Sequence, residues 1–364
     1  MSSSRAYFDN PGDLIAAIPA ILGFIPERSL LVMVLADSAC DPPLDSAYVF
    51  AAMRFDLELP PEFIGEPAEL IAAAVTQVCA SADSTEVLAV VVDDRATIAD
   101  RDIHAGLLTD LAQHLADSRV GLENGWTTAA IEPGSPWWSL LGPTVEGVIA
   151  DPKSSVLTAA VVAEGQPVYS SRSERVALLE PDQEAAERVG ELLPAARAEV
   201  LDDYAAKRRN GDTDGGTRWG CERALGLIAA CDAGHVPTDR ESAELAAVFA
   251  DDRVRDGLLS TALSNYQRSA ESLWAHLSRT LPTPERAEPA VLLAYSAYVR
   301  GDGVLAGIAV QAALDADPYH RFAILLEGAL EIGLDPYSMR QLGRHGAEIM
   351  RNLGFEIDLP EESS

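Results

Sequence analysis

A group of acidic residues follows one of the most apolar segments of the chain. Asp93 and Asp94 come directly after residues 87–92, VLAVVV. Carboxylates at the carboxyl end of a buried strand lie where open α/β sheets gather their ligands, and a pair of them can hold Mg²⁺ or act as acid and base. One hypothesis is therefore a metal-assisted hydrolase or related enzyme with its acidic site at Asp93 and Asp94. Further candidates follow shortly along the chain: Asp100, Asp102 and His104.

The same residues also have a structural interpretation. Asp93, Asp94 and Arg95 form a short polar segment between an apolar segment and one with helical spacing. Aspartate is a preferred residue at helix N-termini, where its side chain accepts backbone hydrogen bonds. A solvated turn whose acidic residues cap the next helix explains the pattern as well as a metal site does.

A second candidate site is the segment that joins the first helix-like run to the first strand-like run. A functional interpretation places it against a ligand, with Gly23 permitting close approach and Ser29 donating a hydrogen bond. The alternative is an ordinary connection in which Gly23 ends a helix, Phe24 packs into the core and Pro26 fixes the turn.

Trp137 and Trp138 form a third candidate, a binding surface. Adjacent residues on a strand point to opposite faces of the sheet, so one ring can be in the core while the other is exposed or packs against a second domain. An exposed tryptophan would suit an interface anchor, and interdomain packing is the alternative.

Motifs for common cofactors are missing from the sequence. It contains no Gly-x-x-x-x-Gly-Lys-Ser/Thr, no Gly-x-Gly-x-x-Gly between a strand and a helix, and no Gly-x-Ser-x-Gly. The six histidines lack the i, i+4 spacing of a helical zinc site, and the four cysteines form no Cys-x-x-Cys pair. No cofactor is indicated, and a disulfide scaffold is not expected.

Composition and charge narrow the class of protein further. The chain has 364 residues, a formal net charge of −30 and 48% hydrophobic residues. The hydrophobic content excludes wholesale disorder, and the negative charge repels nucleic-acid phosphates. The densest basic run, residues 207–209, suits the end of a helix better than a nucleic-acid contact. No signal peptide or membrane span is evident, so we expect a soluble, cytoplasmic protein without a membrane partner.

The first half of the chain supplies the elements that must position these candidates. Continuous apolar runs at 29–36 and 87–92 predict strands buried on both faces, and the alternation at 54–59 predicts a strand with one wet face. Helical spacing appears at 71–78 and 103–115. Segments 127–131, 156–163 and 168–170 predict further, antiparallel strands. We therefore expect a mixed α/β layered sheet domain at residues 1–180.

Helical periodicity takes over after Pro181. Residues 181–218 read as a connecting helix and a polar loop, and residues 219–364 as an all-helical domain with a short C-terminal tail. Predicted helices lie near 218–231, 240–250, 270–280, 289–300, 303–314 and 319–330.

One helical pair has the spacing of a tetratricopeptide repeat. Small residues at Ala294, Gly301 and Ala306, followed by Asp317 and Pro318, match one such unit, and no second copy is found at a 34-residue offset. One tetratricopeptide-like hairpin in a compact bundle is one interpretation, and a peptide-binding groove is the other.

Several of these segments together resemble a known family. Residues 22–30 read Leu-Gly-Phe-x-Pro-x-x-Ser-Leu, and supporting matches lie at 137–140, 252–256 and 293–318. They resemble an actinobacterial family catalogued as domain of unknown function 4192. The resemblance implies a cytoplasmic actinobacterial protein and supplies no activity or catalytic residues. Many members carry a cysteine just after the Trp-Ser position, and residues 141–155 contain none here.

The sequence therefore favours a non-enzymatic binding or regulatory protein that acts through protein–protein contacts, with a protein partner of unknown identity. The alternative is the metal-assisted hydrolase with its site at Asp93 and Asp94.

Overall fold

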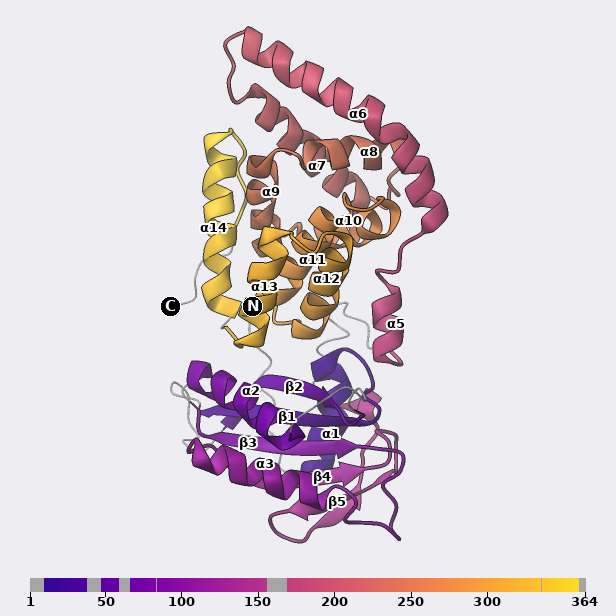
Figure 1. Ribbon diagram of the computed structural model, residues 1–364, viewed down its shortest axis with the longest axis vertical. Helices are drawn as coiled ribbons and strands as arrows, with labels where there is room; N and C mark the ends of the chain where they lie inside the picture. The colour runs from indigo at the N-terminus through magenta and orange to yellow at the C-terminus, as the bar shows by residue number, and fades with distance from the viewer. Residues whose placement is uncertain are drawn as a thin grey trace. The chain divides into compact units, whose positions relative to one another are not determined.

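The computed structural model describes residues 10–37, 47–58, 66–82, 84–155, 169–334 and 336–359. The chain forms two compact units (Figure 1). One contains residues 1–174 and 331–333, and the other contains residues 175–330 and 334–364. This division falls within α5 (Arg172–Ala177), whereas the sequence placed the change of character after residue 180.

The first unit contains a six-stranded mixed sheet with the order β2-β1-β3-β4-β5-β6, which confirms the predicted α/β fold class. Strand β1 is antiparallel to β2 and to β3, β3 and β4 are parallel, and the remaining pairs are antiparallel. The strands are β1 (Ser29–Asp37), β2 (Ala47–Asp56), β3 (Glu86–Val92), β4 (Gly121–Thr128), β5 (Pro136–Leu141) and β6 (Glu146–Val148).

Two strand predictions need correction. The strand predicted at 127–131 is the end of β4 and stops at Thr128. It is antiparallel to β5, as predicted, but parallel to β3 on its other side, because the helix between β3 and β4 returns the chain to the same end of the sheet. The strand predicted at 54–59 ends at Asp56, since its partner β1 begins at Ser29, the residue opposite. The predicted strand at 156–163 lies outside the described residues, and of the one at 168–170 only Tyr169 and Ser170 are described.

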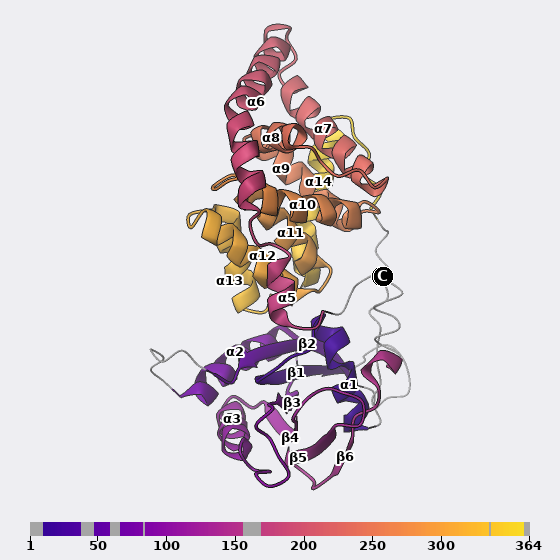
Figure 2. The ribbon, with the colours of Figure 1, turned by 90° about the vertical axis from the view of Figure 1, so that its right-hand side faces the viewer.

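Helices cover both faces of the sheet, α1 (Pro11–Leu22) on one side and α2 (Pro67–Ala82) and α3 (Ala105–Asp117) on the other (Figure 2). Along β1 the side chains alternate. Leu30, Val32 and Val34 join the core under α2 and α3, while Leu31 and Met33 are buried on the opposite face. Burial on both faces is the reason β1 and β3 read as continuous apolar runs.

The second unit is helical, as predicted. Its core surrounds α11, in which every residue from Pro289 to Val299 is buried, and which lies in the middle of the unit in both views (Figures 1 and 2). The helices are α6 (Gln183–Arg209), α7 (Gly215–Asp232), α8 (Asp239–Val248), α9 (Asp252–Leu258), α10 (Gln267–Thr280), α11 (Ala287–Val299), α12 (Gly303–Ala316), α13 (Arg321–Glu331) and α14 (Pro336–Asn352). The sequence predictions omitted α9 and α14. Within the described residues, no helix is both long and apolar enough to cross a membrane.

Helices α11 and α12 pack against each other across a tight turn, where Gly301 has a φ of 88°. Asp302 caps α12 by accepting a hydrogen bond from the Leu305 amide at 3.0 Å. The tetratricopeptide-like character of this pair stays a prediction. The basic run at 207–209 forms the last turn of α6, where positive charge favours the helix dipole.

Candidate functional site

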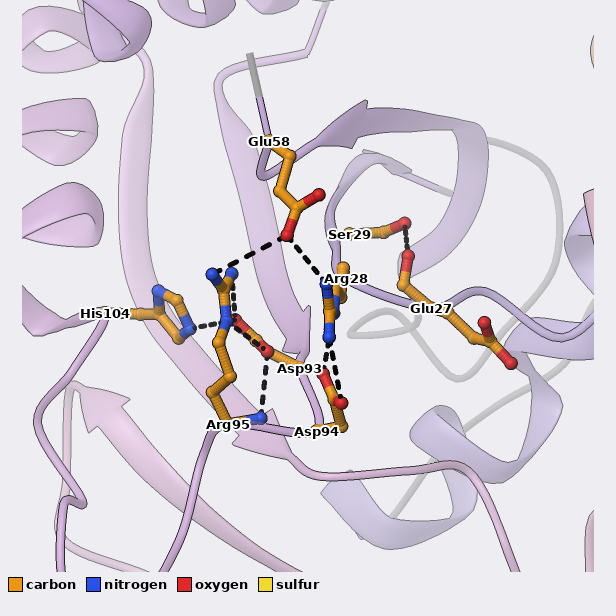
Figure 3. Close-up of polar contacts among 8 residues, drawn as sticks. All are labelled: Glu27, Arg28, Ser29, Glu58, Asp93, Asp94, Arg95 and His104. Carbon is orange, nitrogen blue, oxygen red and sulfur yellow. Dashed lines mark hydrogen bonds and ion pairs between the residues drawn. The ribbon is translucent and has the colours of Figure 1, made fainter.

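The predicted acidic residues lie at one end of the sheet, where β1 begins and β2, β3 and β4 end. Ser29 pairs with Asp56 on one side and with Val92 on the other, and Val92 pairs with Thr128. Residues just beyond these strand ends therefore meet (Figure 3). We call this group the Asp93 cluster, and it consists of Arg28, Glu58, Asp93, Asp94, Arg95 and His104.

Asp93 is the centre of the cluster and is fully buried. Its carboxylate accepts hydrogen bonds from Arg95 Nε at 2.9 and 3.0 Å, from Arg95 Nη2 at 2.8 Å and from the Arg95 amide at 3.0 Å. His104 Nε2 lies 2.8 Å from Oδ2 of the same carboxylate. The backbone amide of Asp93 donates to the Thr128 carbonyl at 3.0 Å, so the main chain of β4 also holds Asp93 in place.

The surroundings of Asp93 favour its charged form. Burial raises the pKa of this carboxyl, but the hydrogen bonds from Arg95 and His104 outweigh that effect and lower the pKa to about 2. A general base works best with a pKa near the working pH. At neutral pH Asp93 is therefore an ionised anchor for Arg95 and His104 and a poor proton acceptor.

Asp94 has a separate partner, Arg28, as Figure 3 shows. Its carboxylate accepts hydrogen bonds from Arg28 Nε at 2.8 Å and Nη2 at 3.2 Å, and this pairing lowers the pKa of Asp94. Arg28 Nη1 also donates to Glu58 at 2.8 Å, so Arg28 bridges the segments that follow β2 and β3. Each carboxylate of the cluster is thus matched by an arginine of the same chain.

The structure therefore corrects the capping interpretation for Asp93. Asp93 is not solvated, and the N-cap of α3 is His104, whose side chain makes no capping hydrogen bond. Asp93 instead closes a turn by binding the amide two residues ahead. Asp100 and Asp102 are exposed and have no ion pair to the cluster. Across the described residues, no three His, Cys, Asp or Glu side chains are grouped to hold a metal ion.

The segment from Gly23 to Ser29 forms the structural connection that was the alternative to a ligand loop. Gly23 ends α1 with a φ of 74°, a left-handed conformation that favours glycine, and Phe24 is buried in the core. The Ser29 hydroxyl donates to the Glu27 carbonyl at 2.6 Å and accepts from Arg54 Nε at 2.8 Å. Ser29 is fully buried, so its hydroxyl is committed to the protein itself.

Neither tryptophan is the exposed interface anchor considered above. Trp137 and Trp138 lie on β5 and are 4% and 3% exposed. A Cβ added to Gly12 or Gly147 would lie within 3.0 Å of the Trp137 ring, so both glycines make room for it. Trp138 Nε1 donates to the Arg101 carbonyl at 3.0 Å, and the Arg101 guanidinium lies 5.4 Å from the Trp138 ring centre. Both rings are anchored inside the α/β unit because each face of β5 is covered.

Sequence reasoning missed Arg28, Arg54 and Glu58 as members of this end of the sheet. Each adjoins or lies within a segment that the sequence predicted as a strand. The available signal was charge at strand ends. It could not be used because the contacts depend on β1 lying between β2 and β3, an order that periodicity does not reveal.

Together, these features define a two-unit protein, a mixed α/β sheet closed at one end by internal ion pairs and a separate all-helical unit. Residues 11–337 match the model of a family described as Domain of unknown function (DUF4192), and the chain belongs to that family. This match confirms the resemblance found in the sequence. Searches of curated proteins and of solved structures gave no match.

Proposed function

We propose that this chain is a non-enzymatic binding or regulatory protein that acts through protein–protein contacts, with α13 as its docking helix. The observation that carries the proposal is the exposure of large apolar side chains on and just before this helix. Tyr319 is 85% exposed, Ile324 47% and Leu325 69%. Exposed apolar side chains that lie close together mark interaction sites, and aromatic anchors are frequent among them.

Helix α13 carries two large apolar side chains on the side that the fold leaves exposed. Ala323, Leu326 and Ala329 are buried against the helical core. Ile324 and Leu325 point away from that core, on the same side as the exposed Arg321 and Glu331. A helix that serves only to cover a core carries polar residues on its outer side. The two apolar side chains on that side therefore support a role in docking.

The helical pair α11 and α12 supports α13 from within the unit. The Phe322 ring on α13 lies 6.1 Å from the Tyr295 ring on α11, and Tyr319 follows the Asp317-Pro318 step that ends α12. Since α11 is buried on all sides, a tetratricopeptide-type groove along it has no free face. We therefore place docking on α13 rather than in such a groove.

The charge of the chain indicates the kind of partner. A net charge of −30 attracts basic surfaces and repels phosphate backbones. We propose a partner segment with apolar residues flanked by lysine or arginine, and no nucleic-acid or membrane partner. The proposal also places the protein in the cytoplasm, which suits the free thiols of Cys79, Cys221 and Cys231.

We expect Leu325→Lys to weaken capture of this basic partner about thirtyfold or more, with little change in the melting temperature, because it removes the apolar anchor and adds a repelling charge. Leu325 is 69% exposed, so a charge at this position should leave the stability of the fold unchanged. Only the binding free energy should fall, because an anchor side chain contributes about 2 kcal/mol or more to an interface. The measurement is quantitative affinity capture at native expression, compared between the two proteins at two salt concentrations.

Leu201→Lys is the matched control, because Leu201 on α6 is 68% exposed and remote in sequence from α13. It should capture the same proteins as the parent. The proposal fails if Leu325→Lys and Leu201→Lys behave alike, if no partner is recovered reproducibly, or if the captured partners are acidic and insensitive to salt.

A second candidate is the metal-assisted hydrolase at Asp93 and Asp94. The observation in its favour is the 2.8 Å contact between His104 Nε2 and Asp93, a pairing that acid–base sites also use. Against it, a metal ion at Asp93 would have to displace the three contacts from the Arg95 side chain, and Asp94 is turned toward Arg28 instead.

A divalent-metal thermal-shift screen separates the two candidates. If the Asp93 cluster is an internal anchor, millimolar Mg²⁺, Mn²⁺ or Zn²⁺ leaves the melting temperature unchanged. A preformed site at 100-fold excess over its dissociation constant would add about 2.7 kcal/mol to the free energy of unfolding. A saturable rise that disappears in Asp94→Asn would favour the hydrolase.

A further inference from the structure

The helical unit has a surface pocket of about 360 Å³ between the first turns of α6 and the segment at residues 281–286. Its walls combine apolar or small residues with the polar Gln183 and Thr283 and two charged residues, Glu187 and Arg286. The residues that line it include Ala186, Glu187, Gly190, Leu281, Pro282 and Arg286.

Arg286 is a buried cation that forms no ion pair among the described residues, although the carboxylate of Asp315 stabilises its charge from a greater distance. It is 8% exposed, and it donates from Nε to the Ser278 carbonyl and from Nη2 to the Leu179 carbonyl, both at 2.8 Å. Among the described residues no carboxylate lies within ion-pairing distance of its guanidinium. A buried charge without an ionic partner is costly, so an anion that reached it would gain strong charge-assisted hydrogen bonds.

The third nitrogen of Arg286 is the group that can receive a ligand. Nη1 has no hydrogen-bond partner among the described residues, and it is not fully enclosed by protein atoms. It is therefore open to the surroundings, and Arg286 lines the pocket.

We propose that this pocket binds a small organic monocarboxylate, with the carboxylate on Arg286 Nη1 and the apolar part against Pro282 and Ala186. A volume of about 360 Å³ lies in the range of small-molecule sites, which combine apolar walls with a few placed polar groups. Glu187 on the wall disfavours a doubly charged phosphate, and Nη1 is the guanidinium nitrogen that has no partner among the described residues. This site is independent of the docking role of α13.

The test measures binding of sodium benzoate and sodium hexanoate to the full chain by titration calorimetry, with inorganic phosphate for comparison. We expect saturable binding of at least one carboxylate and weaker binding of phosphate. Glu187→Gln should tighten carboxylate binding by about threefold to tenfold, because it removes a like charge at an exposed position. Arg286 is left unchanged, since two of its nitrogens hold backbone carbonyls.

Gly190→Leu should abolish binding by filling the pocket. A Cβ at Gly190 would lie 3.8 Å from Pro282 Cγ, an ordinary contact, so the fold tolerates the substitution while the pocket does not. Two control variants keep the wild-type affinity: Glu184→Gln, which removes a charge from α6 outside the pocket, and Gly307→Leu, at a helical glycine with open space. The proposal is overturned if no carboxylate binds, if phosphate binds more tightly, or if Gly190→Leu binds as the parent does.

Discussion

Replacing Asp93 by asparagine is expected to lower the free energy of unfolding of the α/β unit by about 2–3 kcal/mol at neutral pH. The carboxylate is fully buried and receives the Arg95 guanidinium, the Arg95 amide and His104. An amide of the same size cannot offer two anionic oxygens, so the arginine loses its bidentate partner. Native-state hydrogen exchange of peptides from β3 and β4 reports the change in this unit alone.

The loss should depend on pH in a defined direction. The pKa of Asp93 is about 2 in the folded chain, below its ordinary value of 3.8. The stabilising effect is therefore complete well above pH 4 and is lost as the pH falls through 2. The difference between the parent and Asp93→Asn should fall to about half at pH 3. A difference that stays constant between pH 7 and pH 3 would show that packing, rather than charge, accounts for the loss.

Asp94→Asn is the matched control for this experiment. It changes the neighbouring residue in the same way, but the Asp94 side chain is 64% exposed and its arginine partner stays solvated. Exposed ion pairs contribute little to stability, so exchange rates in β3 and β4 should stay close to those of the parent. Equal losses for the two variants would contradict the distinction between an anchor and a surface pair.

Replacing Asp302 by alanine is expected to lower the free energy of unfolding of the helical unit by about 3–5 kcal/mol. Asp302 caps α12 and pairs with Arg300 at 3.3 Å and with Arg175 on α5. The side chains of Arg175 and Arg300 are only 5% and 14% exposed. Removing their shared carboxylate takes away negative charge beside two largely buried guanidinium groups, while Glu271 still pairs with Arg300.

Asp302→Asn separates the helix cap from the ion pairs. Asparagine is as good an N-cap as aspartate, so this variant keeps the cap and loses only the charge. We expect it to lose most of the stability that alanine loses, and we expect faster proteolysis near α5, which Arg175 holds against α12. Asp315→Ala, at an exposed position on the same helix, should unfold as the parent does. Wild-type stability of Asp302→Asn would show that the buried pairs add nothing.

The sequence was a good guide wherever the signal is local. Apolar runs at β1 and β3 identified strands covered on both faces, and helical spacing identified α2, α3, α6 and α10 to α13. Gly23 ends the first helix, as expected for a glycine, because glycine adopts a positive φ more readily than other residues. The short elements β6 and α9 were not predicted, because few residues carry their periodicity.

The candidate site was only half visible in the sequence. Asp93 and Asp94 stood out because they follow a buried strand, but Arg28, the partner of Asp94, and Glu58, the second partner of Arg28, lie far away along the chain. The sequence also treated the two aspartates as a pair. In the structure their surroundings differ completely, one fully buried and one exposed.

The sequence by itself determined the fold class, the two regions of different periodicity and the family, because burial imposes a period of 2 or 3.6 residues on every strand or helix that covers a core. Only the tertiary structure decided what the charged residues do. Strand order brings Arg28 to Asp94. Helix packing buries Arg286 without an ion pair among the described residues and leaves Leu325 in solvent. These contacts are set by distance in space, and electrostatic interactions fall off with that distance, whatever the separation along the chain.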